Sequence, residues 1–521
     1  MDNKNPLSFT NKKFNPIALV IFAIVSVVFF YLCKRLFFYD EDIFIVNPQS
    51  SFISDFSRGA VVKLTFLSDQ FFYKTNSTGY HVTNILLHLI NTFLAAYIFY
   101  VLMELTPIVY SKAIKTSYIF FFLFLLSPIH GEPLCYLLGR AGLIVTFFCL
   151  LSFFFFLKAK FKKPASLIIS LFFFLVALFS YEISWTFPLI ILCASIYLKN
   201  HLQLTRRQIL IYTTPFFIVF VIWFLIKTIW FDQLKITPYG NDIFITSDPS
   251  HLFKNVIVLF FRNVMPPFEN TGIFVALSSI VCGFFLFGLL KLKAKNKPVF
   301  LFCLFSLSAI FLTYLPAVAF GINSHNSESE RYIYFSSVFM IMLLATFFSM
   351  ITDQRVMRLV VTVVCSIYAY SLFVTINDYV QGGNFSKNYL EILAREQNKY
   401  QYIYLINQPS QYSGALLFRA YGDRASTSEK NITTVQDFMY SLYKKNDAEY
   451  ITLSKKQISK NDDIKNLVHN PIDNLPIVFP EFHFNPIQNI LINSATNDSV
   501  FLKKGNSIII GLKLSSIYIF N

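Results

Sequence analysis

The stretch "SYIFFFLFLLSPIHGEPLCYLLGRAGLIVTFFCLLSFFFFL", residues 117–157, decides the class of fold. It holds two long runs of apolar residues, and between them lies a polar turn at 127–140 that carries His130, Glu132 and Arg140. A helix needs about 20 apolar residues to cross the hydrocarbon core of a bilayer. The stretch therefore predicts two neighbouring membrane spans joined by a charged turn.

The composition of the whole chain indicates the same class. Of its 521 residues, 55% are hydrophobic, 18% aromatic and only 14% charged, whereas soluble domains carry about 25% charged residues. The net charge of +15 would suggest nucleic acid as the partner of a soluble protein. Here we assign it to basic loops that face the cytoplasm, and we expect no nucleic-acid partner. The seven cysteines form no C-x-x-C pair, so neither a disulfide framework nor a zinc site is predicted.

Apolar runs of this kind recur over the first 380 residues. They predict an α-helical polytopic membrane protein with about eleven transmembrane helices. The candidate spans lie at 14–36, 83–103, 117–130, 139–157, 165–180, 183–198, 209–230, 272–290, 298–318, 332–350 and 359–377.

The last part of the chain is more polar. It contains short runs typical of strands at 400–407, 477–482 and 507–514, separated by residues that favour turns. We therefore predict a transmembrane domain at 1–380, with its first outer loop at 37–82. A small α+β domain is predicted at 381–521.

Lysine and arginine are concentrated in alternate loops, and loops rich in these residues face the cytoplasm. This bias places the N-terminus in the cytoplasm and, with an odd number of spans, the domain at 381–521 outside it. The basic residues of the predicted inner loops are Lys4, Lys12, Lys13, Lys112, Lys115, Lys158, Lys160, Lys162, Lys163, Lys199, Arg206, Arg207, Lys291, Lys293, Lys295, Lys297, Arg355 and Arg358.

Four charged clusters lie at the outer ends of the predicted spans. A charge at membrane depth costs roughly 2.5–3.5 kcal/mol on insertion scales, so four such loops at one level indicate a shared polar cavity. Plainer explanations exist for single members: a carboxylate can be a solvated loop residue, an arginine can reach the lipid headgroups, and a histidine packed in a helix is more often structural than a metal ligand. The clusters are Asp40, Glu41 and Asp42; His130, Glu132 and Arg140; Glu182; and Glu328, Glu330 and Arg331.

The residue types in this cavity suit one kind of chemistry. A carboxylate can act as a general base that takes a proton from an attacking hydroxyl. An arginine can bind phosphate through two parallel hydrogen bonds. A lipid-linked phosphosugar presents its phosphate at the same depth, so the parts suit a glycosyltransferase that uses such a donor. The same parts can also bind a transported ion or solute, and the residues alone leave both readings open.

Four motifs resemble those of the transmembrane O-mannosyltransferases that carry tetratricopeptide repeats, and of their bacterial relatives. The first, "GYHVTNILLHLINTFLAAYIFY" at 79–100, matches through His81, Asn84, His88 and Asn91. The other three are "SPIHGEPLCYLLGRAGLIVTFF" (127–148), "SYEISWTFPLIIL" (180–192) and "SERYIYFSS" (329–337).

The order and approximate spacing of these motifs agree over roughly residues 30–350. The chain therefore resembles the glycosyltransferase C superfamily, a polytopic membrane fold with its active site on the outer face. It departs from the relatives by Tyr181, where lysine is usual, and by Ser336, where proline is common. No tetratricopeptide array follows the membrane part.

The resemblance implies a polyprenyl-phosphate-linked sugar as donor and inversion at the anomeric carbon. It places the catalytic base in the first outer loop, within the acidic pair Asp40 and Glu41. Asp40 is the first choice and Asp42 the reserve. Arginines in the outer turns become candidates for the donor phosphate, with neighbouring carboxylates orienting them or the sugar. The residues predicted to bind the donor are Arg140, Arg331, Glu132, Glu182, His130 and Glu330.

The sequence thus predicts a bacterial inner-membrane glycosyltransferase that transfers a sugar to an acceptor outside the cytoplasm. The acceptor, whether a protein hydroxyl, a surface glycan or a lipid, is left open. We expect no cofactor and no metal, although some members of the superfamily use a divalent ion. The alternative is a transporter or flippase for a lipid-linked sugar, in which pseudo-symmetric halves with broken helices are typical.

Overall fold

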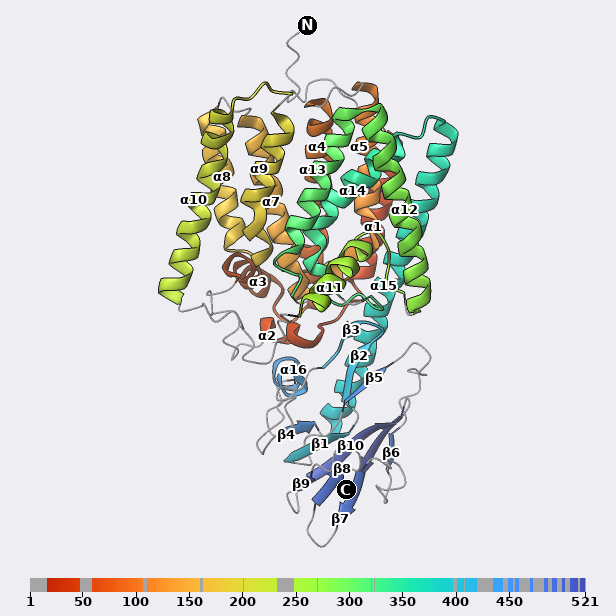
Figure 1. Cartoon of the computed structure of the whole chain (residues 1–521). Coiled ribbons are helices and arrows are strands. Elements are labelled where there is room, and N and C mark those ends of the chain that lie inside the picture. The colour runs from red at the N-terminus through yellow and green to blue at the C-terminus, as the bar shows by residue number, and fades with distance from the viewer. Residues whose placement is uncertain are drawn as a thin grey trace. The chain divides into compact units, whose positions relative to one another are not determined.

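The structure is a computed structural model of the chain, shown in Figure 1. In the membrane part it describes residues 16–46, 59–105, 110–159, 163–199, 201–231, 248–268, 270–319, 321–322 and 324–396. In the C-terminal part it describes residues 401–406, 408–418, 434–443, 448–452, 455–458, 469–471, 482–485, 490–493, 499–501, 507–513 and 516–520.

Every apolar run predicted as a span contains a helix. Six of the described helices are long and apolar enough to cross a membrane, or seven if one bent pair counts as a span, and four shorter apolar helices account for the remaining runs. A mostly helical, multi-span membrane protein is thus confirmed, while the number eleven stays a prediction. The helices are α1 (Pro16–Cys33), α4 (Ser77–Leu105), α5 (Tyr110–Leu125), α7 (Arg140–Ala159), α8 (Pro164–Leu178), α9 (Phe187–Leu198), α10 (Arg206–Phe231), α12 (Thr271–Lys295), α13 (Lys297–Tyr314), α14 (Tyr334–Ser349) and α15 (Gln354–Glu396).

Helix α14 forms the centre of the helical bundle. Every side chain from Tyr334 to Phe348 is buried, and the helix packs against α5, α7 and α13, which run alongside it in Figure 1. A helix that is apolar on all sides is expected in the interior of a bundle. By contrast, α10, α12 and α15 expose large apolar side chains such as Ile222, Phe287 and Leu359, as lipid-facing helices do.

The polar turn of the stretch 117–157 breaks the apolar run earlier than predicted. Helix α5 ends at Leu125 and not at residue 130, because Ser127 precedes Pro128 and takes an extended ψ of 130°, as residues before proline do. The three short helices η2 (Pro128–His130), α6 (Gly131–Cys135) and η3 (Leu137–Gly139) follow. The axis bends by 47° between α5 and this segment. Glu132, which lies in the bent segment, is buried.

The C-terminal part contains the predicted strands. A five-stranded sheet has the order β4-β1-β10-β11-β6, with β1 parallel to β10 and β4, and β10 antiparallel to β11. Its strands are β1 (Tyr402–Ile406), β4 (Glu449–Thr452), β6 (His469–Pro471), β10 (Ser507–Lys513) and β11 (Ser516–Phe520). The predicted runs at 400–407 and 507–514 contain β1 and β10 within the described residues. Of the run at 477–482, only Phe482 lies within the described residues, at the start of β7.

Two three-stranded sheets and one helix complete the described C-terminal elements. One sheet has the order β3-β2-β5, and the other is an antiparallel meander, β7-β8-β9. Their bounds are β2 (Gln408–Tyr412), β3 (Ala415–Leu416), β5 (Lys455–Ile458), β7 (Phe482–Asn485), β8 (Ile490–Asn493) and β9 (Ser499–Phe501), and the helix is α16 (Thr434–Tyr443).

The chain divides into two compact units. The first comprises residues 1–34, 55–67 and 80–376, and the second comprises residues 35–54, 68–79 and 377–521. The division falls inside α15, which also runs through the predicted boundary at 380. The second unit therefore includes η1 (Asp40–Asp42) and α2 (Ile43–Val46), which belong to the first outer loop.

Candidate functional site

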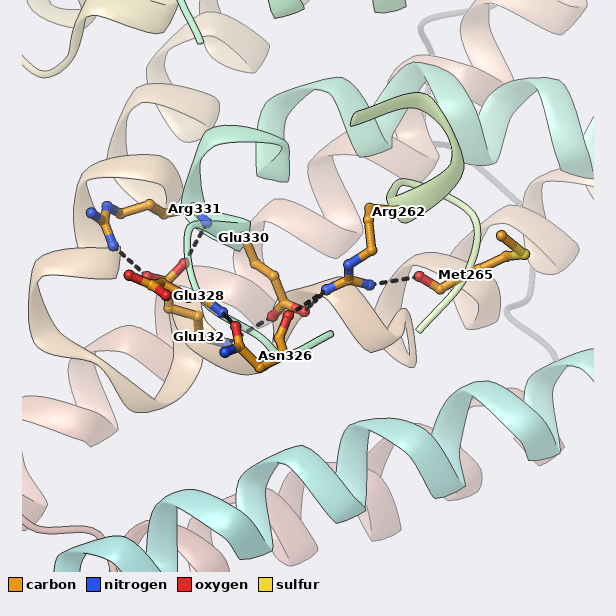
Figure 2. A network of polar contacts seen from close by, with 7 residues as sticks. All are labelled: Glu132, Arg262, Met265, Asn326, Glu328, Glu330 and Arg331. Carbon is orange, nitrogen blue, oxygen red and sulfur yellow. Dashed lines mark hydrogen bonds and ion pairs between the residues drawn. The ribbon is translucent and has the colours of Figure 1, made fainter. Parts of the chain in front are cut away.

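Two of the predicted site residues, Glu132 and Arg331, form an ion pair in the first unit. Glu132 lies in α6, and Arg331 lies in η6 (Glu330–Tyr332), the turn before α14. The Arg331 guanidinium pairs with Glu132 Oε1, and the Arg331 backbone N–H donates to Glu132 Oε2 at 2.8 Å. One carboxylate thus fixes both the backbone and the side chain of Arg331, as Figure 2 shows.

A second ion pair lies next to the first. Arg262 Nη2 donates to Glu330 Oε1 at 2.6 Å, and both side chains are completely buried. Glu330 Oε2 accepts the backbone N–H of Glu132 at 3.1 Å, so the two pairs are joined. We call Glu132, Arg262, Glu330 and Arg331 the charge network. Its formal charges balance, which is the arrangement that buried charges require.

Arg262 is the member of this network that the sequence analysis did not predict as a site residue. It is the last residue of α11 (Pro249–Arg262), a helix that lies crosswise to the spans in Figure 1. Its guanidinium also donates to the backbone carbonyls of Met265 at 2.7 Å and Asn326 at 3.3 Å. A signal was present in the sequence, because an arginine stands at the end of an apolar run just before Pro266 and Pro267.

Arg331 is the partly accessible member of the charge network. Its side chain is 21% exposed, whereas the side chain of Glu132 is 1% exposed. The guanidinium lies 5.0 Å from the ring centroid of Tyr332 and 5.8 Å from that of Tyr136. The ring of Tyr181 stacks on Tyr332 with centroids 6.2 Å apart. Arg331 therefore presents a cation among tyrosine rings.

The contact between the rings of Tyr181 and Tyr332 brings the loop at 179–185 next to η6. Glu182 directly follows Tyr181 and begins η4 (Glu182–Thr186), where it is half-buried. The start of α7 also packs closely on η6: a Cβ added at Gly142 would lie 2.7 Å from the Arg331 carbonyl oxygen. Glycine is thus required there by the close approach of two backbones. Residues from three of the four predicted charged loops, with Tyr181 beside Glu182 for the third, thus pack around η6.

Arg140 lies at a different position from Arg331. Its guanidinium is buried and donates to Asn84 Oδ1 at 2.6 Å, to the Tyr80 carbonyl at 2.9 Å and to Thr65 Oγ1 at 3.3 Å. It also lies 4.5 Å from the ring centroid of Phe66. These contacts join α4, α7 and α3 (Ala60–Tyr73). They give Arg140 a structural task, and its predicted role at the donor phosphate stays a prediction.

The polar residues of the first motif hold the bent turn in place. Asn84, His88 and Asn91 lie on one face of α4, as their spacing requires. Asn84 Nδ2 donates to the Pro133 carbonyl at 3.2 Å, and Asn91 Nδ2 donates to the Leu143 carbonyl at 2.9 Å. His88 contacts the Leu125 carbonyl at 3.2 Å through Nε2. The motif thus attaches α4 to the end of α5, to α6 and to the first turn of α7.

His130, at the end of η2, belongs to a buried group of aromatic side chains. Its Nε2 lies 3.1 Å from Ser337 Oγ, and its ring centroid lies 4.9 Å from that of His88 and 4.5 Å from that of Tyr334. Tyr334 in turn bonds His88 Nδ1 at 2.8 Å. Among the residues that the structure describes, no group of three or more His, Cys, Asp or Glu side chains is arranged to hold a metal ion.

The acidic residues of the first outer loop lie in the second unit. Asp40 and Asp42 are buried, and Glu41 is half-buried. The Asp40 backbone N–H donates to the Leu417 carbonyl at 3.0 Å, and Asp42 Oδ2 accepts the Tyr39 N–H at 3.1 Å. Because the charge network belongs to the first unit, the predicted meeting of both groups in one cavity stays a prediction.

Asp40 has an unusual backbone conformation. Its φ is +39°, a region in which non-glycine residues are uncommon and in which asparagine and aspartate are the better-tolerated types. Such strained residues cluster at active sites and cost of order 1–3 kcal/mol. Asp42 has a structural role as the acceptor for Tyr39. The choice of Asp40 as the first candidate for the base, with Asp42 as the reserve, stays a prediction.

Burial gives Glu330 a pH-dependent effect on stability. It raises the pKa of the Glu330 carboxyl from 4.5 to about 7, although Arg262 opposes the shift. Since the folded state binds this proton more tightly than the unfolded state, the stabilisation is complete below the unfolded pKa and is lost as the pH rises through about 7. We expect the melting temperature in detergent to fall between pH 5 and pH 8 more in the wild type than in Glu330→Gln.

The neighbouring carboxylate provides the control for this measurement. Glu328 lies in the same loop and is half-buried, so Glu328→Gln removes a carboxylate of this loop while Glu330 and its pairing with Arg262 are kept. Equal slopes in the wild type and Glu330→Gln would show that Glu330 does not titrate in this range.

Comparisons with known proteins give a likeness in structure but none in sequence. No protein-family model matches the chain, and no curated protein matches it in sequence. The fold is similar to a solved structure described as "Crystal Structure of ArnT from Cupriavidus metallidurans bound to Undecaprenyl phosphate", with a TM-score of 0.45 and 9% sequence identity over 75% of this chain and 82% of that chain. A likeness at this level carries no argument about function.

Proposed function

We propose that this protein is a membrane glycosyltransferase. It transfers a sugar from a polyprenyl-phosphate-linked donor to an acceptor outside the cytoplasm, with inversion at the anomeric carbon. The observation that supports it most is Arg331: a guanidinium held by a buried carboxylate, partly exposed, at a turn between apolar helices. A phosphate carried by a membrane lipid is the ligand that best matches such a cation.

The surroundings of Arg331 suit this ligand. Arginine has five N–H donors in a fixed plane, and Glu132 fixes the direction of that plane from its buried side. The accessible part of the guanidinium is therefore already oriented when a phosphate binds. Less side-chain conformational entropy of Arg331 is lost, which favours binding. The rings of Tyr181 and Tyr332 beside it offer flat apolar surfaces for the sugar.

The catalytic base in this proposal is Asp40. Its carboxylate takes the proton of the acceptor hydroxyl as the hydroxyl oxygen attacks the anomeric carbon, and the lipid phosphate leaves with the bonding electrons. Direct displacement of this kind inverts the anomeric carbon. Arg331 stabilises the negative charge that develops on the leaving phosphate, and such fixed donors act most strongly where charge develops. No metal ion is part of the proposal.

The cellular arrangement follows from the distribution of basic loops. We place the chain in a bacterial inner membrane with the N-terminus in the cytoplasm and the domain at 381–521 outside. The donor reaches the site from the bilayer, and the acceptor reaches it from the extracytoplasmic side. Six or seven of the helices in the described part of the chain can cross a membrane, which agrees with a multi-pass protein.

The proposal is tested by turnover of a panel of radiolabelled polyprenyl-phosphate sugars by purified protein in detergent, with membrane extract as the source of acceptors. We expect one donor to lose label to an acceptor. Arg331→Ala should lower that rate about a hundredfold, because it removes one charged donor to the leaving group. Arg331→Lys should recover part of the rate, since it keeps the charge but not the planar fork.

Arg355 provides the matched control for Arg331. It is an exposed arginine at the start of α15, so Arg355→Ala should keep the wild-type rate. If the wild type turns over none of the donors but binds one of them tightly, and Arg331→Ala removes the binding, a carrier of lipid-linked sugars replaces the transferase. If Arg331→Ala turns over as the wild type does, Arg331 is not the phosphate ligand.

A further inference from the structure

Helix α11 has two different faces although it is too short to span a bilayer. Its 14 residues begin at an Asp248 cap, whose carboxylate accepts the Ser250 N–H at 3.0 Å, with proline at the first helical position. One face buries Asn255, Leu259 and Arg262. The opposite face is exposed over a stripe that we define by Phe253, Lys254 and Ile257.

The buried face is attached to the first unit by several hydrogen bonds. Asn255 Nδ2 donates to the Val318 carbonyl at 2.8 Å. It also lies against Gly321, whose φ is +70° and where an added Cβ would come within 2.8 Å of the Asn255 side chain. Just after the helix, Asn263 Nδ2 donates to Ser336 Oγ at 2.7 Å. A displacement of α11 therefore acts on residues that lead into α14.

The exposed stripe continues onto the lipid-facing surface of a spanning helix. Phe253 is 68% exposed and Ile257 is 39% exposed. One turn further along α11, the ring of Phe260 stacks on Phe311 of α13 with centroids 5.9 Å apart, and Phe311 is itself 46% exposed. Exposed apolar side chains on a short helix with a basic residue among them are typical of helices that lie in the membrane interface.

We propose that the stripe of α11 contacts the acyl chains and headgroups of the bilayer, and that this contact positions the Glu330–Arg331 turn through Arg262. Lys254 extends to the anionic headgroups, and Phe253 and Ile257 enter the acyl boundary. The lipid surface is thus a structural partner of the charge network. This inference goes beyond the sugar-transfer reaction and does not depend on it.

The connection from the stripe to the turn passes through atoms in direct contact. The last residue of α11, Arg262, bonds Glu330 Oε1 at 2.6 Å. Glu330 Oε2 accepts the Glu132 N–H at 3.1 Å, and Glu132 accepts the Arg331 N–H at 2.8 Å. Figure 2 shows these residues in one row, from Met265 beside Arg262 to Arg331. Two backbone amides, those of Glu132 and Arg331, therefore report on the position of α11.

The first test measures lipid contact directly. The full chain carries p-benzoylphenylalanine at position 253 and is reconstituted in nanodiscs of phosphatidylethanolamine and phosphatidylglycerol. After illumination, mass spectrometry should find phospholipid attached to the peptide that contains residue 253. The control carries the same residue at position 325, because His325 is exposed in a polar loop of the same unit, and it should give no phospholipid adduct.

The second test measures, by hydrogen exchange in the same nanodiscs, whether the stripe of α11 is coupled to the Glu330–Arg331 turn. Phe253→Ser/Ile257→Ser changes only the exposed stripe, so it should fold. We expect the peptides that contain the amides of Glu132 and Arg331 to exchange several-fold faster, on the order of tenfold, in this variant. Arg262→Gln should accelerate the same peptides, and Arg262→Lys should accelerate them less.

The matched control is Ile218→Ser/Ile222→Ser on α10. These residues have the same spacing and are 52% and 51% exposed, but they belong to another helix, so the two reporter peptides should keep wild-type exchange. The proposal is overturned if residue 253 gives no lipid adduct, or if the stripe variant leaves both reporter peptides unchanged. Neither readout requires sugar transfer, so a failed glycosyltransferase assay does not decide this question.

Discussion

Asp40→Asn is expected to abolish sugar transfer, with a loss of rate of about a thousandfold, while the fold is kept. A positioned general base contributes about 10²–10⁴ to a rate, and asparagine cannot accept the hydroxyl proton. Asparagine has the shape of aspartate and tolerates the positive φ of +39° at this position. The measurement is the initial rate with the active donor, together with donor binding, which should stay at the wild-type level.

Two further substitutions separate chemistry from backbone strain. Asp40→Ala should lose the rate and also lower the melting temperature, because alanine lacks the local hydrogen bonding that helps aspartate and asparagine in the left-handed region. Asp42→Asn should keep most of the rate, since its side-chain oxygen can still accept the Tyr39 N–H. A full rate in Asp40→Asn combined with a lost rate in Asp42→Asn would assign the base to Asp42.

Arg262→Gln is expected to cause the largest loss of stability, about 3 to 5 kcal/mol in the free energy of unfolding at pH 8. This is the range for removing one partner of a buried ion pair, and both side chains of the pair with Glu330 are completely buried. The loss should be smaller at pH 5, because the Glu330 carboxyl, with its pKa already raised to about 7, is then neutral. Denaturant unfolding in detergent measures both values.

A double substitution identifies the cause of this loss. Arg262→Gln/Glu330→Gln removes both charges, so most of the stability at pH 8 should return. Arg355→Gln, which removes an exposed arginine, should change the free energy of unfolding by less than about 0.5 kcal/mol. If the double variant is as unstable as Arg262→Gln, the packing of the Arg262 side chain matters more than its charge.

Local patterns were sufficient to predict the helices. Each predicted span contains a helix because about 20 apolar residues in sequence leave the backbone no other way to satisfy its hydrogen bonds in a bilayer. Ser127 and Pro128 could be read in the sequence as the end of a helix. The predicted span was nevertheless extended to residue 130 because the neighbouring residues are apolar, whereas α5 ends at Leu125. The conformational restriction that proline places on the preceding residue ended this helix, although the hydropathy of the segment favours a longer span.

The site was predicted only in part, since its members meet through tertiary contacts. Glu132 and Arg331 were both predicted, and the structure pairs them over 199 positions of sequence. Arg262 was missed because a single arginine at a helix end has many explanations until its partner, Glu330, is known. Arg140 was predicted as a phosphate ligand from the family resemblance, and this stays a prediction; its hydrogen bond to Asn84 could not be read from the sequence.

The buried position of α14 has a consequence for biosynthesis. Its neighbours α5, α7 and α13 all precede it in the chain, so they leave the ribosome first and enter the bilayer before their common partner exists. A nascent chain that ends before Tyr334 leaves the inner surfaces of these three helices to lipid or to a chaperone. The bundle therefore closes late in translation, when α14, whose side chains from Tyr334 to Phe348 are all buried, moves from the translocon into the space between them.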